Sequence, residues 1–124
     1  KTNMEEKMKI SEAELEVLQV LWDAEEPLKI QDVCDRLENK KWKYNTVGTL
    51  LLRMVEKGAV VSEKKNRIIY YRPVWEREAY QKEQTETLID RLYHGSAKEL
   101  AVSLFQGGNM TKEDLEDIRK MFDL

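Results

Sequence analysis

The spacing of apolar residues changes from a helical to an extended pattern at Gly58. Before this glycine, three segments carry apolar residues at intervals of three and four, which predicts three amphipathic helices separated by short turns. After it, one run of β-branched and aromatic residues, interrupted by a polar turn, predicts a single β-hairpin. A small domain with this order of elements has few ways to bury its apolar residues, so the change of pattern strongly limits the fold.

The first two helices have recognisable ends. Ser11 and Glu14 have the spacing of a capping box and predict a first helix that ends near Ala24. Leu28 is expected to be extended, and a second helix is expected over about residues 30–38.

The third helix is expected over about residues 45–57, after a polar and basic turn. Asn45 or Tyr44 should lie near its start, where asparagine is a good cap. The hairpin is expected within residues 59–73, with a polar turn at residues 64–67. Three helices followed by a hairpin with a basic tip is the order of a winged helix-turn-helix domain.

The rest of the chain is expected to be helical, with narrow apolar stripes among many charges. Helices are expected over about residues 75–93 and 97–105, and a third is expected after a cap at Thr111 to Asp114. Such helices need a partner surface, and the simplest partner is the same segment of a second chain. The candidate dimerisation residues are Leu88, Leu92, Leu100, Leu104, Leu115, Ile118 and Phe122.

These patterns together predict a mainly α fold with a small β-hairpin. Residues 1–73 are assigned to a winged-helix DNA-binding domain, and residues 74–124 to C-terminal dimerisation helices.

Charge is unevenly distributed along the chain. The formal net charge is −3, but residues 36–67 hold nine basic residues against three acidic ones. This segment is therefore +6, and the remainder is −9. A basic block inside an acidic protein indicates a confined surface for a polyanion such as nucleic acid. An ordinary solvated surface with uneven charge is the alternative explanation.

The third helix has the most informative polar face. Thr46, Thr49 and Arg53 lie at i, i+3 and i+7, opposite the apolar stripe. In a winged helix this face enters the major groove, where arginine reaches guanine or phosphate and threonine meets thymine methyl groups or phosphate. A solvated helix face is the alternative. The candidate DNA-binding residues of the turn, the helix and the hairpin are Lys41, Lys43, Asn45, Thr46, Thr49, Arg53, Lys64, Lys65 and Arg67.

The sequence contains no recognisable catalytic motif. The only histidine, His94, is expected at the surface or as a helix cap, and the only cysteine, Cys34, as a buried structural thiol. We therefore expect neither an enzyme nor a cofactor or metal site. No segment approaches the roughly 20 apolar residues of a membrane span, and residues 1–10 are too charged for a signal peptide, which predicts a cytoplasmic protein.

Four segments of the chain form a distinctive set, namely ISEAELEVLQVLWD (10–23), NTVGTLLLRMVEKGAV (45–60), YYRPVWEREAY (70–80) and DLEDIRKMF (114–122). Through these segments the sequence resembles, over residues 10–124, the BlaI/MecI family of penicillinase and methicillin-resistance repressors. The resemblance implies a winged helix, a C-terminal dimerisation region and a homodimer that represses genes by occupying palindromic operators. It also implies a regulatory protease as a partner in derepression, and Thr46, Thr49 and Arg53 match the family's recognition-helix pattern.

The chain departs from the family pattern at several positions. Asn45 and Gly48 stand where relatives usually have basic or bulkier polar residues, which implies a different operator preference. Relatives that are cleaved during antibiotic signalling have an Asn-Phe bond where this chain has Ser103-Leu104. Copper-responsive relatives carry paired C-x-C motifs, whereas this chain has only Cys34.

These observations favour a transcriptional repressor that binds palindromic operator DNA as a homodimer. The alternative is a winged-helix module that contacts only other proteins. Retention on heparin and salt-sensitive binding to duplex DNA distinguish the two hypotheses.

Overall fold

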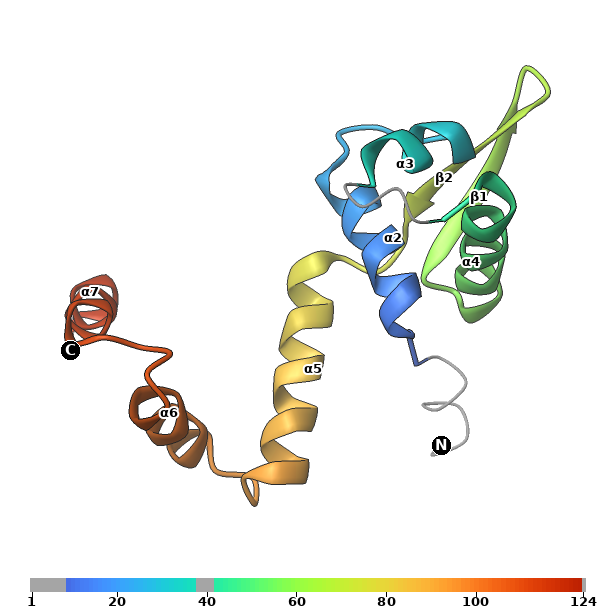
Figure 1. The fold of residues 1–124 in the computed structure, drawn as a ribbon. Coiled ribbons are helices and arrows are strands. Elements are labelled where there is room, and N and C mark those ends of the chain that lie inside the picture. Colours follow the sequence, from blue (N-terminus) through green and yellow to red (C-terminus); the bar gives the residue numbers. More distant parts are fainter. Residues whose placement is uncertain (1–8, 38–41, 124) are drawn as a thin grey trace. The chain divides into compact units, whose positions relative to one another are not determined.

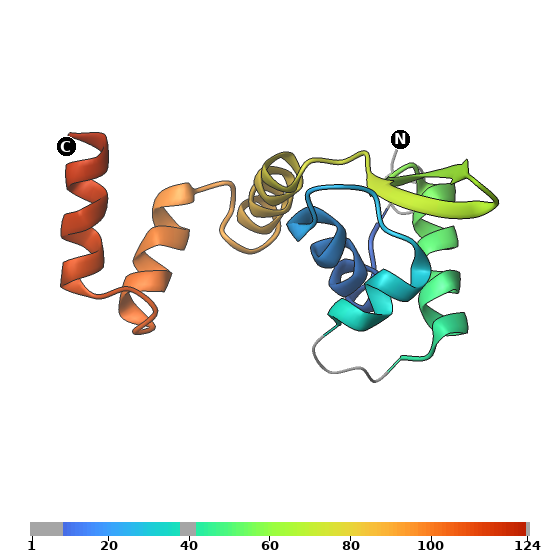
Figure 2. The same cartoon turned by 90° about the horizontal axis from the view of Figure 1, so that it is seen from above.

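The computed structural model describes residues 9–37 and 42–123 of the chain (Figures 1 and 2). These residues form helices and one antiparallel hairpin, which confirms the predicted mainly α fold class with a small β-hairpin. The chain divides into two compact units, the first ending at Ala79 and the second beginning at Tyr80.

The first unit is a bundle of three helices with the hairpin packed against it (Figure 1). Its elements are α2 (Glu12–Asp23), α3 (Ile30–Arg36), α4 (Tyr44–Lys57), β1 (Val60–Lys65) and β2 (Ile68–Pro73). Helices α3 and α4 both pack on α2, and α4 also lies along β1. The side chains of one core come from all of these elements, among them Val17, Leu18, Leu21, Val33, Val47, Leu51, Met54, Val60 and Tyr71.

Helix α2 begins as the sequence predicts. The Ser11 hydroxyl accepts the Glu14 N–H at 3.1 Å, and the Glu14 carboxylate accepts the Ser11 N–H at 2.9 Å. This reciprocal capping box satisfies two amides that would otherwise have no partner at the start of the helix.

Leu28 is extended, as expected, and forms an isolated bridge with β2. Its N–H donates to the Tyr71 carbonyl at 3.0 Å, and the Tyr71 N–H donates to the Leu28 carbonyl at 2.7 Å. Both side chains are buried. The segment between α2 and α3 is therefore fixed to the hairpin, which holds the helices and the hairpin in one unit.

The hairpin turn is shorter than the sequence predicts. The expected four-residue turn at residues 64–67 is wrong, because Lys64 and Lys65 belong to β1 and pair with Ile69 and Ile68. Only Asn66 and Arg67 form the turn, with φ of 54° and 70°. Two central residues with positive φ make a tight turn whose twist matches that of the paired strands, and asparagine tolerates this conformation well.

The second unit contains most of α5 (Arg77–Leu92), all of α6 (Ala97–Gln106) and all of α7 (Lys112–Phe122). Helix α7 begins with the predicted cap, in which Thr111 and Asp114 form a capping box. None of these three helices has a buried residue. Across the described ranges, no helix combines the length and the apolar character that a membrane span requires.

Candidate nucleic-acid interface

The amino end of α4 begins at Tyr44, with Lys43 as the N-cap. The prediction that Asn45 lies near this end is confirmed, but Asn45 is inside the first turn and does not cap the helix. Lys43 makes no side-chain cap, since its ammonium group has no acceptor for a backbone amide. The first turn contains no acidic residue. Within this first turn, therefore, no carboxylate offsets the positive end of the helix dipole.

Helix α4 has one buried and one exposed face. The buried face consists of Val47, Leu50, Leu51 and Met54. On the other side, Thr46, Thr49 and Arg53 are all exposed, and so is Asn45. The structure thus brings the three residues of the predicted polar stripe together on a surface that a ligand can reach.

The hydrogen bonds and ion pairs of two side chains on this face, Thr49 and Arg53, determine what they offer to a partner. The Thr49 hydroxyl donates a hydrogen bond to the Asn45 carbonyl at 3.0 Å, which leaves its methyl group and an accepting lone pair for an external partner. None of the ion pairs between described residues involves Arg53. No carboxylate within the described ranges therefore neutralises this guanidinium group.

Gly48 lies where α4 approaches α3. A Cβ atom at this position would lie 3.3 Å from the Ile30 Cδ1 atom, which is a tight contact. The absence of a side chain at Gly48 therefore allows the two helices to pack closely. A larger residue at this position would therefore require the Ile30 side chain or the α3–α4 packing to shift.

The basic residues of the hairpin are all exposed, but they do not all share one face. In β1, Lys64 lies on the face of Val60, whereas Lys65 lies on the opposite face. Arg67 lies in the turn itself. Of the candidate DNA-binding residues, Lys41 lies outside the described residues.

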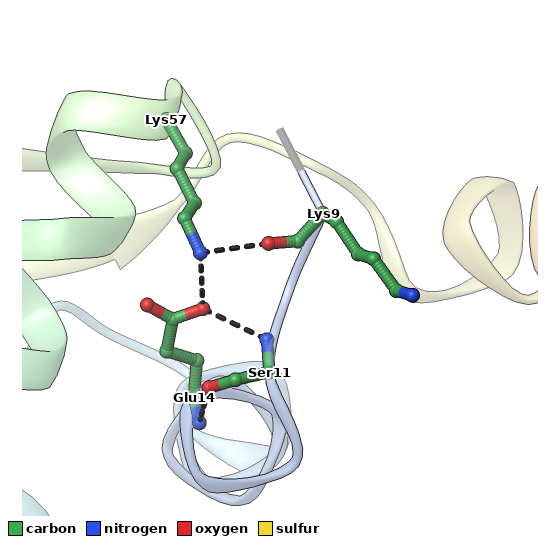
Figure 3. A network of polar contacts seen from close by, with 4 residues as sticks. All are labelled: Lys9, Ser11, Glu14 and Lys57. Atoms are coloured by element: carbon green, nitrogen blue, oxygen red, sulfur yellow. Dashed lines mark hydrogen bonds and ion pairs between the residues drawn. The ribbon is translucent and has the colours of Figure 1, made fainter. Parts of the chain in front are cut away.

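A buried ion pair attaches the carboxyl end of α4 to the start of α2 (Figure 3). The Lys57 ammonium group donates to the Glu14 carboxylate at 2.6 Å and to the Lys9 carbonyl at 2.7 Å. Burial raises the pKa of Glu14, but the hydrogen bonds from Lys57 and Ser11 outweigh this effect, and the pKa lies below its ordinary value. The Lys57–Glu14 ion pair thus attaches the last turn of α4 to α2 and does not involve Thr46, Thr49 or Arg53.

Leu52 is a feature of α4 that the sequence analysis missed. It is 56% exposed, so it does not belong to the apolar stripe of its two preceding leucines. A helical projection could have found it, since at about 100° per residue Leu52 falls opposite the core and beside Thr49.

The C-terminal helices have exposed apolar side chains. Of the candidate dimerisation residues, Leu88, Leu92, Leu115 and Phe122 are exposed, and Leu100, Leu104 and Ile118 are partly exposed. The predicted set omitted three further exposed apolar residues of α6 and α7, namely Val102, Phe105 and Met121.

The only cysteine and the only histidine of the chain lie in different units. Cys34 is only partly buried, which corrects the expectation of a buried thiol, and burial together with the nearby Asp35 carboxylate raises its pKa. His94 is exposed at the end of α5, as expected, with Nδ1 3.6 Å from a Glu99 carboxylate oxygen.

Comparison with known proteins gives a consistent result over almost the whole chain. A family model described as penicillinase repressor matches residues 10–123. The penicillinase repressor of Bacillus licheniformis is 24% identical over 114 residues, which cover 92% of this chain and 89% of that protein. The methicillin resistance regulatory protein MecI of Staphylococcus aureus strain N315 is 23% identical, with coverage of 92% and 93%.

Proposed function

Because the chain belongs to the penicillinase repressor family, whose members are transcriptional repressors and not enzymes, we propose that it represses genes by binding palindromic operator DNA as a homodimer. The observation that carries this proposal is the exposed face of α4, where Thr46, Thr49 and Arg53 lie together. In a winged helix this helix lies in the major groove, and its side chains meet base edges.

Two further elements of the first unit supply groups that suit contacts with DNA phosphates. The amino end of α4 offers backbone amides, a positive dipole end and the exposed Lys43, which suit the approach of a DNA phosphate. Lys64, Lys65 and Arg67 of the hairpin add positive charge that suits a wing lying along the DNA backbone or minor groove.

The homodimer is proposed from the exposed apolar side chains of the second unit. Exposed apolar side chains such as Leu88, Leu92, Leu115 and Phe122, on helices that bury no residue of their own, are typical of a surface that another protein covers. A second copy supplies a matching surface by two-fold symmetry, and the dimer then presents two copies of α4 to the two halves of a palindrome.

Two further parts of the proposal rest on the family resemblance. The site of action is the cytoplasm, where a repressor meets DNA. A regulatory protease is proposed as a partner that ends repression, although its cleavage bond must differ from Asn-Phe if it acts at Ser103-Leu104.

Binding to random-sequence DNA followed by selection tests the proposed function. The selected duplex and a scrambled duplex of equal composition are titrated with the full chain at several salt concentrations. We expect the selected duplex to bind at least about 10³-fold more tightly and both affinities to fall with salt. Equal affinities would contradict sequence-specific operator binding, and no binding to either duplex would support the alternative of a winged helix that contacts only proteins.

A further inference from the structure

The exposed face of α4 is not uniformly polar. Asn45, Thr49, Leu52 and Glu56 lie at i, i+4, i+7 and i+11, so they form one stripe along the helix. This stripe is centred opposite the buried residues of α4. Leu52 lies in it with 56% of its surface exposed, and Thr49 is its neighbour at i−3.

An exposed leucine alone carries no functional meaning, because single apolar side chains are common on protein surfaces. Leu52 differs because it adjoins a second apolar group on the same face. The Thr49 hydroxyl uses its proton on the Asn45 carbonyl, so the side chain offers a partner its methyl group and an accepting lone pair but no donor. Leu52 and the Thr49 methyl group therefore form a small apolar surface between the polar residues of α4.

The charges around this apolar surface indicate which partner it meets. Residues 44–55 of α4 contain no acidic residue, Arg53 follows Leu52 directly, and the one acidic residue of the helix is Glu56 at the far end of the stripe. Lys43 precedes the helix at its amino end. A polyanion that binds these cations along α4 brings its own groups close to Leu52 and Thr49, and an apolar group there would bury the leucine side chain. In the major groove of DNA, the exposed apolar group is the 5-methyl group of thymine.

We infer that Leu52 and Thr49 form a specificity surface that selects thymine by its 5-methyl group. This inference rests on the proposed function, in which α4 lies in the major groove, and adds the type of base that this part of the helix recognises. Arg53 reads guanine or phosphate beside it. Each half of the operator is then expected to contain at least one thymine whose methyl group is required for full affinity.

Substitution of deoxyuridine for thymine tests the inference directly, since deoxyuridine lacks only the 5-methyl group and keeps its base pairing. Each thymine of the selected operator is replaced in turn, and the full-length protein is titrated with each duplex. Burial of one methyl group contributes about 0.8 kcal/mol, so the loss of a required methyl group is expected to weaken binding about fourfold.

The protein variants assign the effect to its residues. Leu52→Ala is expected to weaken binding to the thymine operator about fourfold to tenfold and to abolish the penalty of deoxyuridine at one position. Leu52→Met, which keeps an apolar side chain of similar volume, is expected to retain the penalty. Thr49→Ser removes a methyl group but keeps the hydroxyl, and is expected to reduce the penalty at the adjacent thymine.

Val74→Ala is the matched control, because Val74 is also an exposed aliphatic residue of the first unit, with 50% of its surface exposed, but does not belong to α4. It is expected to leave the deoxyuridine penalty unchanged. Specific binding without any deoxyuridine penalty would overturn this inference alone, and so would an unchanged penalty in Leu52→Ala. A protein that binds no duplex specifically would overturn the proposed function and this inference with it.

Discussion

The Lys57 ammonium group lies 2.6 Å from the Glu14 carboxylate and joins the last turn of α4 to the first turn of α2. The Glu14 side chain is 2% exposed and that of Lys57 is 22% exposed, so the carboxylate is shielded from water while the ammonium group remains partly exposed. The same carboxylate accepts the Ser11 N–H, and the ammonium group also binds the Lys9 carbonyl. One buried carboxylate therefore caps one helix and positions another.

Glu14→Gln is expected to lower the free energy of unfolding by about 1–3 kcal/mol near neutral pH, because it removes a charged hydrogen bond and leaves Lys57 unpaired. Denaturant unfolding at a fixed protein concentration measures the change. Glu12→Gln is the control, since Glu12 lies in the same first turn but is exposed. Equal stability of Glu14→Gln and the wild type would show that the pair does not stabilise the fold.

The same pair predicts a dependence of stability on pH. The pKa of Glu14 is lower in the folded protein than its ordinary value, so its stabilising effect is complete above that ordinary value. The effect is lost as the pH falls through the ordinary value and then through the lowered one, because the carboxylate becomes protonated. The stability difference between wild type and Glu14→Gln should therefore shrink on acidification. A difference that stays constant down to the acid limit of folding would contradict this assignment.

Arg53→Ala is expected to weaken binding to the selected operator by about 1–3 kcal/mol. Arg53→Lys separates two roles of the residue. Lysine keeps a phosphate contact but not the fork geometry that reads guanine, so it should restore affinity only if Arg53 contacts phosphate. Fluorescence titration at fixed salt measures all three proteins. If Arg53→Ala binds the operator with the affinity of the wild type, Arg53 does not belong to the DNA interface.

Alanine at all three basic positions of the hairpin tip, Lys64, Lys65 and Arg67, should weaken binding to every duplex alike. It should also reduce the slope of log affinity against log salt by up to about 3, as phosphate contacts are lost. The single variants Lys64→Ala and Lys65→Ala should differ, because these residues lie on opposite faces of β1. A matched triple alanine variant of exposed lysines in the second unit serves as the charge control, with changes at Lys82, Lys98 and Lys112. An equal loss of slope in both triple variants would mean that the wing makes no direct contact.

A fragment that ends at Ala79 is expected to fold and to remain monomeric at micromolar concentration. This end point keeps Trp75 and Arg77, which hold the chain to α2. Trp22 Nε1 donates to the Trp75 carbonyl at 2.8 Å, and the Arg77 guanidinium lies over the Trp22 ring and pairs with Asp23. Sedimentation should show a monomeric fragment and a dimeric full chain. The affinity of the fragment for the full operator should be about 10²-fold or more below that of the full chain, since the two half-site readers are no longer linked. A dimeric fragment would place the interface in the first unit.

Much of the fold was predictable because its signals are local. The capping box of Ser11 with Glu14, and that of Thr111 with Asp114, each depend on residues three apart, and Gly58 ends α4 through its own positive φ of 83°. The buried face of α4 was also predictable from its spacing. The same periodicity also predicted that Thr46, Thr49 and Arg53 lie on the opposite face of this helix.

The features that the sequence did not predict depend on contacts between distant residues or on side-chain exposure. Glu14 and Lys57 are 43 positions apart, and the pairing of Leu28 with Tyr71 joins two segments through their backbones. The polar character of residues 64–67 suggested a loop, although strand pairing extends through Lys65 because the turn needs only two residues. Leu52 follows two buried leucines, and only its angular position on α4 separates it from them.

The stoichiometry and affinity of the complex with the selected palindrome test the central claim most directly. Sedimentation of the full chain with this duplex, and with a duplex that contains only one half-site, measures both quantities. We expect two chains on the palindrome and an affinity at least about 10²-fold higher than that for the single half-site. One chain per palindrome, or equal affinity for the palindrome and the half-site, would contradict a dimer that reads DNA with two copies of α4.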